Sequence, residues 1–379
     1  MKFTKQIIFL LLTAIMPLCM AKVKKVEKSM EHILKHKIPG NPRNSEGSFV
    51  KLADGTLYFA YTCYNGTGSN DHASADIAAV TSKDNGKTWS KPFIVLKNTK
   101  MNLMSVSLLR LQNGRIAMVY SEKSAIPGWK NFVDCRSKII FSDDETVSWS
   151  KPVEIANVPP AYFVVNNDRL IQLKSGRLIL PTAHHQYDSG KMGDGIVKFF
   201  ISDDSGITWR ISKESIYPPS PMSRGFMEPG VVEMNDGRVM CFIRTAVGCQ
   251  YKAFSYNRGE NWTAAVPAPE FISPEAPMSI KRNPESGKLY AVWNDHNVLR
   301  SVRVDSLKWK RTPLVIAESS DDGVTWQNHR ILEDSPTRGY CYIAMFFNGR
   351  QLHLGYCCGG LPDCSHTLQE TKLCHINID

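Results

Sequence analysis

The chain has 379 residues, of which 42% are hydrophobic and 22% are charged, and its formal net charge is +10. This composition provides enough apolar material for a large core and excludes an intrinsically disordered protein. The excess of basic residues favours anionic partners. Beyond the short run at residues 22–25 the Lys and Arg residues do not cluster, so we expect no nucleic-acid partner.

The first 21 residues have the pattern of a secretory signal peptide. Two lysines precede an apolar run at residues 7–18, and Ala21 supplies the small residue that suits cleavage. The run is short for a membrane span, and no later segment is apolar enough for one. We therefore predict a secreted or periplasmic protein without stable membrane insertion. The alternative is a lipid anchor on Cys19, which the preceding Leu18 disfavours. Cleavage removes two lysines and no acids, so the charge falls from +10 to +8.

An eight-residue motif recurs along the rest of the chain. The clearest copies, SKDNGKTW, SDDSGITW and SSDDGVTW, begin at Ser82, Ser202 and Ser319. Weaker copies, SDDETVSW and SYNRGENW, begin at Ser142 and Ser255. The closing tryptophans of the five copies are 60, 60, 53 and 64 residues apart. A long and nearly constant period is the signature of a repeat architecture.

Hairpin signals alternate with these octets. Turn pairs ending in Gly and flanked by β-type residues begin at six positions: Asp54, Asn113, Ser175, Asp236, Ser286 and Asn348. A third apolar run, such as residues 76–82, follows each hairpin, and in most units an octet and a short fourth run come next. Four short antiparallel strands per unit, without a helical pattern, predict an all-β, six-bladed β-propeller for residues 22–379. We expect a strand from residues 27–39 to close the ring.

The octet itself has a structural explanation. Its Asp side chain can accept hydrogen bonds from the amides of the turn, and its Gly supplies an unusual backbone angle. Its Trp can pack between neighbouring sheets. We therefore expect the octets to stabilise the blades and to take no part in catalysis.

The octets resemble the Asp-boxes of the sialidase (neuraminidase) superfamily, whose members are six-bladed propellers. The resemblance covers nearly the whole chain after the leader. It implies a site at the mouth of the propeller, where the inner strands converge. Counting eight residues back from each hairpin turn places Glu46, Ser105, Glu228 and Tyr340 at this mouth, and counting forward places Arg244 there.

Three residues resemble the catalytic residues of the family. Glu228 in GFMEPG and Tyr340 in RGYCYI are similar to its base and its nucleophilic tyrosine, and Tyr342 is the next candidate for the latter. Asp71 in GSNDHAS is similar to the acid/base aspartate, and Asp76 is its rival. The chemistry needs these residue types, because a neutral tyrosine is not repelled by a substrate carboxylate and an adjacent Glu can take its proton. A separate acid must protonate the leaving oxygen.

Three arginines resemble the triad that binds the carboxylate of the sugar: Arg43, Arg244 and Arg311. Arginine suits this task because its planar fork binds a carboxylate bidentately. The sequence around Arg43 reads NPRNSE, where the family usually has Arg-Ile-Pro, and Glu46 adds an acid at the mouth. These departures leave open which acidic sugar is bound.

Two further residues are candidates for substrate contact. Arg169 either adds an arginine to the pocket or pairs with Asp168 to hold its strand. His184, or its neighbour His185, ends the second strand of the third blade near the mouth. The Cys and His residues near the C-terminus match no zinc-binding spacing, so we expect no metal and no organic cofactor.

These residues together predict an exported exo-glycosidase of the sialidase type. It would hydrolyse a terminal sialic acid or a related acidic sugar from a glycan with retention of configuration, acting as a monomer. The alternatives are a propeller glycosidase for a different acidic sugar, such as another keto-deoxy acid or a uronic acid, and a carbohydrate-binding propeller without catalysis.

Overall fold

The computed structural model describes residues 23–29, 31–35, 40–129, 132–155, 158–188, 191–297, 311–362, 364 and 366–378. The predicted leader lies outside these residues. Their regular structure consists of β-strands, which confirms the all-β prediction. The described part of the chain contains no helix with the length and apolarity that crossing a membrane requires.

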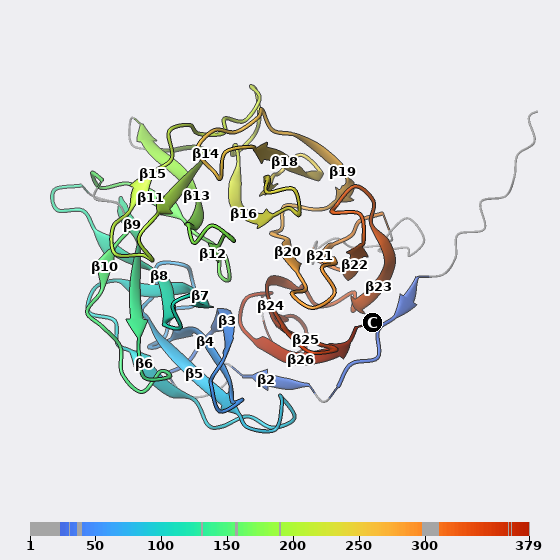
Figure 1. The fold of residues 1–379 in the computed structure, drawn as a ribbon. Helices are drawn as coiled ribbons and strands as arrows, with labels where there is room; N and C mark the ends of the chain where they lie inside the picture. The colour runs from blue at the N-terminus through green and yellow to red at the C-terminus, as the bar shows by residue number, and fades with distance from the viewer. Residues whose placement is uncertain are drawn as a thin grey trace, which may run out of the picture.

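The strands form six antiparallel blades around a central axis, and the first strand of each blade lies nearest to that axis (Figure 1). Blades 1 and 2 contain β3 (Asn44–Lys51), β4 (Leu57–Tyr64), β5 (Ala75–Ser82), β6 (Phe93–Leu96), β7 (Asn102–Arg110), β8 (Ile116–Ala125), β9 (Val133–Ser142) and β10 (Val153–Glu154). Blades 4 and 5 contain β16 (Met227–Glu233), β17 (Val239–Arg244), β18 (Cys249–Ser255), β19 (Val266–Ile272), β20 (Ser279–Arg282), β21 (Leu289–Asn294), β22 (Leu314–Ser319) and β23 (Gln327–Glu333).

Blade 3 has an inner strand in two pieces, and one piece joins it to blade 2. Its strands are β11 (Tyr162–Val164), β12 (Ile171–Gln172), β13 (Leu178–Asp188), β14 (Lys191–Ser202) and β15 (Arg210–Ile211). Tyr162 of β11 pairs antiparallel with His185 of β13 and parallel with Cys135 of β9. Blades 2 and 3 thereby share one continuous sheet.

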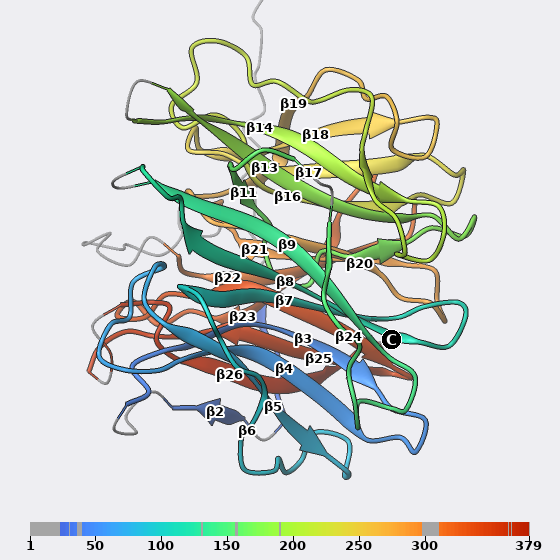
Figure 2. The ribbon, with the colours of Figure 1, turned by 90° about the vertical axis from the view of Figure 1, so that its left-hand side faces the viewer.

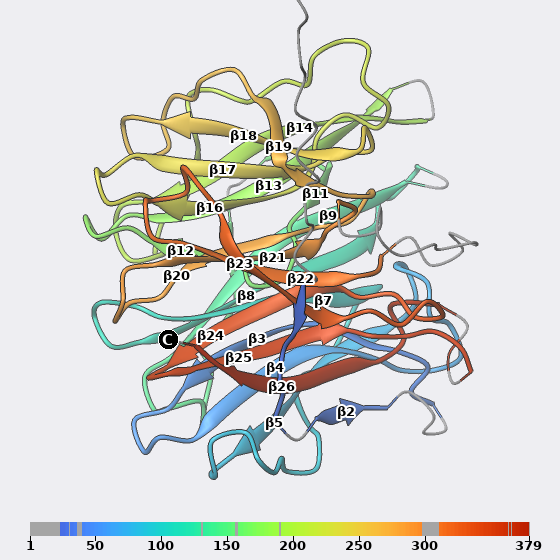
Figure 3. The same ribbon diagram turned by 90° about the vertical axis from the view of Figure 1, so that its right-hand side faces the viewer.

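The N-terminal segment closes the ring. Blade 6 contains β24 (Cys341–Asn348), β25 (Gln351–Cys357) and β26 (Thr371–Asn377), and its outermost strand is β2 (His32–Leu34), which pairs antiparallel with β26. The predicted closing strand is thus confirmed. The preceding strand β1 (Lys24–Lys25) runs parallel to the outer strand β23 of blade 5 (Figure 3).

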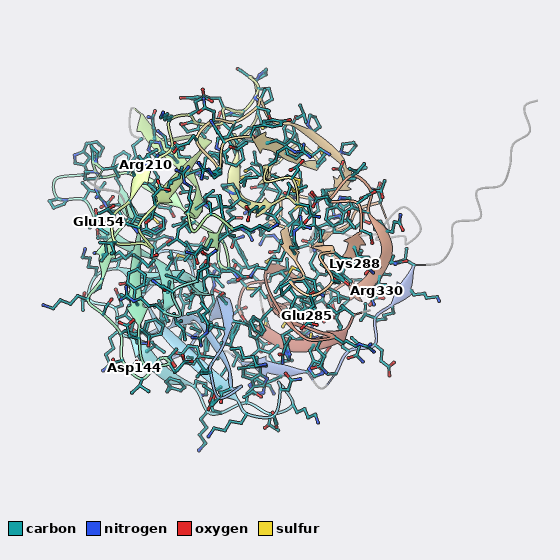
Figure 4. All side chains as sticks on the ribbon, in the orientation of Figure 1. Asp144, Glu154, Arg210, Glu285, Lys288 and Arg330 are labelled. Carbon is teal, nitrogen blue, oxygen red and sulfur yellow. The ribbon has the colours of Figure 1, made fainter. Side chains whose placement is uncertain are left out.

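The octets stabilise the turns between the third and fourth strands. In the copy from Ser202, Asp204 accepts hydrogen bonds from the amide (2.9 Å) and hydroxyl (2.5 Å) of Thr208, and the Ser202 hydroxyl accepts one from the Gly206 amide (2.8 Å). The octets lie away from the axis, as Asp144 of another copy shows near the rim (Figure 4). Their predicted structural role agrees with this position.

The octet tryptophans pack between blades. Trp262, which closes the octet of blade 4, stacks on Phe199 of blade 3 with 4.0 Å between ring centroids. Phe199 is fully buried among apolar residues of β13, β14, β17 and β18. Each such contact removes aromatic surface from water and holds adjacent sheets together.

Candidate active site

Four inner strands carry the same irregularity at the same end of the propeller. β3, β7, β16 and β24 each contain a β-bulge, and in each bulge one non-glycine residue has a positive φ: Glu46 (56°), Ser105 (60°), Glu228 (39°) and Tyr342 (57°). A bulge re-aims a side chain, and a positive φ in such residues is strained. All four residues line one cavity on the axis. The strained residue of each of these four bulges therefore lies where the side chains converge.

Tyr342 and Glu228 form the central pair of this cavity. The Tyr342 hydroxyl donates a 2.9 Å hydrogen bond to Oε1 of Glu228. The expectation that Tyr340 faces Glu228 is wrong. The Tyr340 side chain is 2% exposed and lies in the apolar core of blades 5 and 6, with its ring 6.3 Å from that of Tyr356.

The turn of blade 6 explains this error. In blade 1 the hairpin closes on the pair Lys51–Leu57, whereas in blade 6 it closes on Asn348–Gln351, over a much tighter loop. Asn348 is itself the last paired residue of β24, whereas Asp54 in blade 1 comes three residues after the last paired residue, Lys51. A count of eight residues back from Asn348 therefore reaches too far toward the N-terminal end of the strand. It ends at Tyr340 and misses Tyr342, the bulge residue.

Two arginines surround the Tyr342–Glu228 pair. Arg244 donates to Oε2 of Glu228 (2.5 Å) and to Oε1 of Glu275 (3.1 Å). The Arg311 guanidinium carbon lies 5.6 Å from the centroid of the Tyr342 ring, and its Nη1 donates to Sγ of Cys341 (3.0 Å). The structure thus brings together Glu228, Arg244 and Arg311, as the sequence predicts.

The charges around the pair set the protonation states of its members. Burial alone would raise the pKa of Glu228, but Arg244 and Arg311 outweigh burial and lower it below its usual value. Burial, reinforced by the negative charge of Glu228, raises the pKa of Tyr342 well above its usual value. The resting state is therefore a neutral phenol that donates to a carboxylate.

Arg43 is buried behind two carboxylates. Its guanidinium donates to Oδ1 of Asp71 (2.6 Å), to Oε1 of Glu46 (2.9 Å) and to the Ser45 hydroxyl (3.0 Å). Arg43 is only 1% exposed, whereas the Asp71 side chain is 56% exposed. Of this group, Glu46 and Asp71 line the cavity, so Arg43 acts on it through its partners.

Glu46 and Asp71 are driven in opposite directions by their surroundings. Burial, with the charges of Asp71 and Glu228, raises the pKa of Glu46 despite Arg43. The Ser105 hydroxyl also donates to Glu46 at 2.5 Å. Burial opposes ionisation of Asp71 as well, but Arg43 and Lys123 lower its pKa. In the free protein Asp71 is thus the better ionised of the two.

The loop that carries Asp71 is held by neighbouring blade 2. The backbone carbonyl of Asp71 accepts hydrogen bonds from Nδ2 of Asn102 (2.9 Å) and Nζ of Lys123 (2.7 Å). Asp76, the rival acid, instead accepts bonds from the Asn65 side chain and the Asn98 amide (both 2.8 Å) at the base of the loop. The structure therefore places Asp71 in the cavity and gives Asp76 a scaffold position.

Two predicted contact residues lie elsewhere. Arg169 is buried in a separate small cavity on the axis, where it donates to the Met278 carbonyl (2.6 Å) and the Ser279 hydroxyl (3.1 Å) of blade 5. Asp168 pairs with Lys281, not with Arg169. His184 stacks on Phe163 with 4.4 Å between ring centroids, so the expectation that these two residues reach the substrate is wrong.

Part of the cavity wall comes from two residues that were not among the candidates from the sequence. Tyr162 and Lys123 line it, and Nζ of Lys123 lies 5.5 Å from the centroid of the Tyr162 ring. Counting eight residues forward from Asn113 reaches Ser121, and Lys123 comes two residues later. Alternate residues of a strand share a face. That periodicity would have found Lys123. Among the described residues no three His, Cys, Asp or Glu side chains gather as metal ligands would.

Comparisons with known proteins identify the family of the chain. Residues 55–354 match the model of the BNR repeat-like domain. The chain belongs to this family. A sialidase of Paraclostridium sordellii is 25% identical over 247 residues, which are 60% of this chain and 58% of the relative. The match therefore covers less than two thirds of that relative's length. Together with the family match, it confirms the resemblance to the sialidase superfamily.

Solved structures share the fold. A Dyadobacter fermentans protein of unknown function has a TM-score of 0.73 at 18% identity, over 93% of this chain and 99% of that chain. A Hadza microbial sialidase has a TM-score of 0.71 at 17% identity, over 92% of this chain and 68% of that chain. Both likenesses show that this chain shares its fold with known structures.

Proposed function

We propose that this protein is an exported exo-glycosidase that hydrolyses a terminal sialic acid, or a closely related acidic sugar, with retention of configuration. The observation that carries the proposal is the 2.9 Å hydrogen bond from Tyr342 to Glu228, flanked by Arg244 and Arg311. A neutral phenol paired with a carboxylate base, beside cations, suits attack on an anomeric carbon that bears a carboxylate.

The first half of the reaction forms a glycosyl–enzyme bond. Arg311 and Arg244 hold the substrate carboxylate, and Oη of Tyr342 attacks the anomeric carbon while its proton passes to Glu228. The bond to the leaving oxygen breaks, and Asp71 gives that oxygen a proton. In the second half Asp71 takes a proton from water, which attacks the same carbon. The bond to Tyr342 breaks, and the released Tyr342 oxygen takes its proton back from Glu228. Two inversions at one carbon give net retention.

The protonation of Asp71 depends on the substrate. In the free protein Arg43 lowers the pKa of Asp71, which is the wrong direction for an acid. A substrate carboxylate in the cavity that Asp71 lines would add a negative charge and offset the positive charge of Arg43 that now favours ionised Asp71. Binding would therefore raise the pKa of Asp71 and prepare it to donate.

A second candidate function is glycosidase activity on a different sugar. The observation that favours it is the contact of Glu46 with Arg43, because this carboxylate occupies part of the fork that a substrate carboxylate would need. A sugar with a hydrogen-bond donor at this position would suit Glu46 better than sialic acid does. Aryl glycosides of sialic acid, another keto-deoxy acid and a uronic acid separate the candidates.

The decisive experiment is turnover of an aryl sialoside by the native protein and by Tyr342→Phe. Release of the phenol by the native protein alone, with the retained anomer formed first by NMR, supports the proposal. Release from another aryl glycoside only supports the second candidate. Binding of sialic acid without turnover of any substrate would point to a binding propeller.

Export is a separate part of the proposal and rests on the pattern of residues 1–21. Sequencing the N-terminus of protein recovered outside the cytoplasm should begin at Lys22. A lipid-modified Cys19 would instead support the anchored form, and an uncut Met1 inside the cell would contradict export.

A further inference from the structure

Four aromatic side chains form a continuous row that starts in the cavity and ends on the surface. The ring centroids of Tyr162 and Tyr187 are 6.4 Å apart, those of Tyr187 and Phe132 4.5 Å, and those of Phe132 and Trp129 5.3 Å. Tyr162 is 8% exposed, and Trp129 at the other end is 55% exposed. We call these four residues the aromatic row.

The link between blades 2 and 3 builds this row. Because β11 joins β9 to β13, the β8–β9 and β13–β14 hairpins lie side by side and end on the same side of the propeller (Figure 2). The Tyr187 hydroxyl donates to the Val133 carbonyl (2.7 Å), which ties the loop ends of the two hairpins together. The row is therefore mounted on paired strands.

The row begins on the side of the cavity where the leaving group must lie. The ring of His72, next to the proposed acid Asp71, is 6.3 Å from that of Tyr162. A proton donor has to touch the oxygen between the cleaved sugar and the rest of the glycan. The part of a substrate beyond that oxygen would therefore leave the cavity past Tyr162.

Trp129 is exposed although it is a large apolar side chain, and the aromatic row connects it to the cavity. Large apolar side chains left in water and grouped together often mark binding sites. Met192, 49% exposed, pairs across the hairpin from Tyr187 and extends the apolar surface. Aromatic rings offer rigid, flat contact area at low cost in conformational entropy, which matches the apolar faces of sugar rings.

We propose that the aromatic row is the binding subsite for the leaving group of the substrate, and that this leaving group is a neutral oligosaccharide whose sugar rings stack on Tyr187, Phe132 and Trp129. The inference rests on the proposed function for its direction, since Asp71 defines the leaving-group side. Under this proposal the protein prefers extended glycans, and the hairpins of blades 2 and 3 provide that preference.

The test compares two sialosides, one with lactose and one with a nitrophenol as the leaving group. Trp129→Ala should raise KM for the lactose substrate by about 3- to 10-fold, as expected for one lost aromatic contact. It should leave KM and kcat for the aryl substrate unchanged, because a single phenol ends before Trp129. Tyr256→Ala is the matched control, since Tyr256 is 71% exposed in an octet turn at the other end of the blades.

A second measurement does not depend on turnover. Saturation-transfer NMR with free lactose should show contact of the sugar with the native protein and with Tyr256→Ala, and loss of this contact in Trp129→Ala and Phe132→Ala. Absence of saturation transfer in the native protein, or equal KM changes for both substrates, would overturn the subsite. Lactose contact without cleavage of either sialoside would keep the subsite and reject the proposed reaction.

Discussion

The Tyr342 hydroxyl donates to Glu228 across the axis of the propeller, from blade 6 to blade 4, at 2.9 Å. Both residues occupy bulges with positive φ, so neither side chain reaches this position from a regular strand. The strain of two bulges is retained at one cavity, which is typical of a functional site and not of a scaffold. In the proposed reaction this pair would supply the nucleophile and its base, already in contact before any substrate binds.

Replacement of the tyrosine hydroxyl gives the most direct prediction. Tyr342→Phe should abolish turnover of an aryl sialoside, because it removes the attacking oxygen and leaves the ring packed beside Arg311. Glu228→Gln should lower kcat by about 100-fold or more through loss of the base.

Tyr340→Phe is the matched control for that experiment. Its ring lies in the core of blades 5 and 6, so kcat should remain at the native value, with at most a small change in thermal stability. Measured kcat and melting temperature for the three variants check this. Native activity in Tyr342→Phe would contradict the assignment of Tyr342 as the nucleophile. Loss of activity in a folded Tyr340→Phe would assign that role to Tyr340.

The pH dependence of activity should report the titration of the Glu228 and Asp71 carboxylates. Glu228 must be ionised and its pKa lies below the usual 4.5, so activity should fall only as the pH drops below that value. Asp71 must be protonated, so activity falls as the pH rises through its pKa. Because substrate offsets the charge of Arg43, the alkaline limb of kcat should lie at higher pH than that of kcat/KM. Coincident alkaline limbs would contradict this coupling.

Repeated signals made the blades and part of the site predictable. The six hairpin turns and five octets agree with one another, and an error in one unit does not alter the period. Glu46 and Glu228 were located by counting because their hairpins close alike, on Lys51–Leu57 and Glu233–Val239. The tighter turn of blade 6 broke the rule and moved the tyrosine by two residues.

Features that occur once could not be read from the sequence. Strand β11 has three residues, too few to show a period, yet it joins two blades and places Tyr162 in the cavity. Arg169 lies between β11 and β12 and His184 lies on β13, and neither residue lines the cavity. The contacts of Arg43 with Glu46 and Asp71 depend on where a bulge directs each side chain, which the sequence pattern does not encode.

The octets should affect stability and not catalysis. Asp204→Ala removes the acceptor for the Ser202 hydroxyl and for the amide and hydroxyl of Thr208. It should lower the free energy of unfolding by about 1–3 kcal/mol, with kcat unchanged. Asp203→Ala is the adjacent control. The Asp203 side chain is 53% exposed and pairs with Arg177 and Arg210, so its loss should cost less than about 1 kcal/mol. Denaturant unfolding of both variants checks this, and equal losses would remove the special role of the octet.

Glu46 decides between the two candidate functions. Glu46→Gln keeps an acceptor for Ser105 but removes a carboxylate from the side of Arg43. If the substrate is sialic acid, KM should fall by roughly tenfold, because a like charge no longer opposes the substrate carboxylate. If the true sugar donates a hydrogen bond to Glu46, the same variant should raise KM for that sugar. Kinetics on the aryl glycoside panel separates these results. The control is Ser105→Ala, which removes the hydrogen bond to Glu46 but keeps the Glu46 carboxylate.

The role of Asp71 depends on the leaving group. Asp71→Asn should lower kcat by about 100-fold or more on a lactose-linked substrate, whose oxygen must be protonated as it leaves. On a nitrophenyl substrate, whose phenolate leaves without a proton, the loss should be much smaller. Asp76→Asn is the control: Asp76 holds Asn65 and the Asn98 amide at the base of the loop, so its replacement should affect both substrates alike and lower stability. Equal losses on both substrates for Asp71→Asn would remove it from the acid role, and a leaving-group dependence seen only in Asp76→Asn would transfer that role to Asp76.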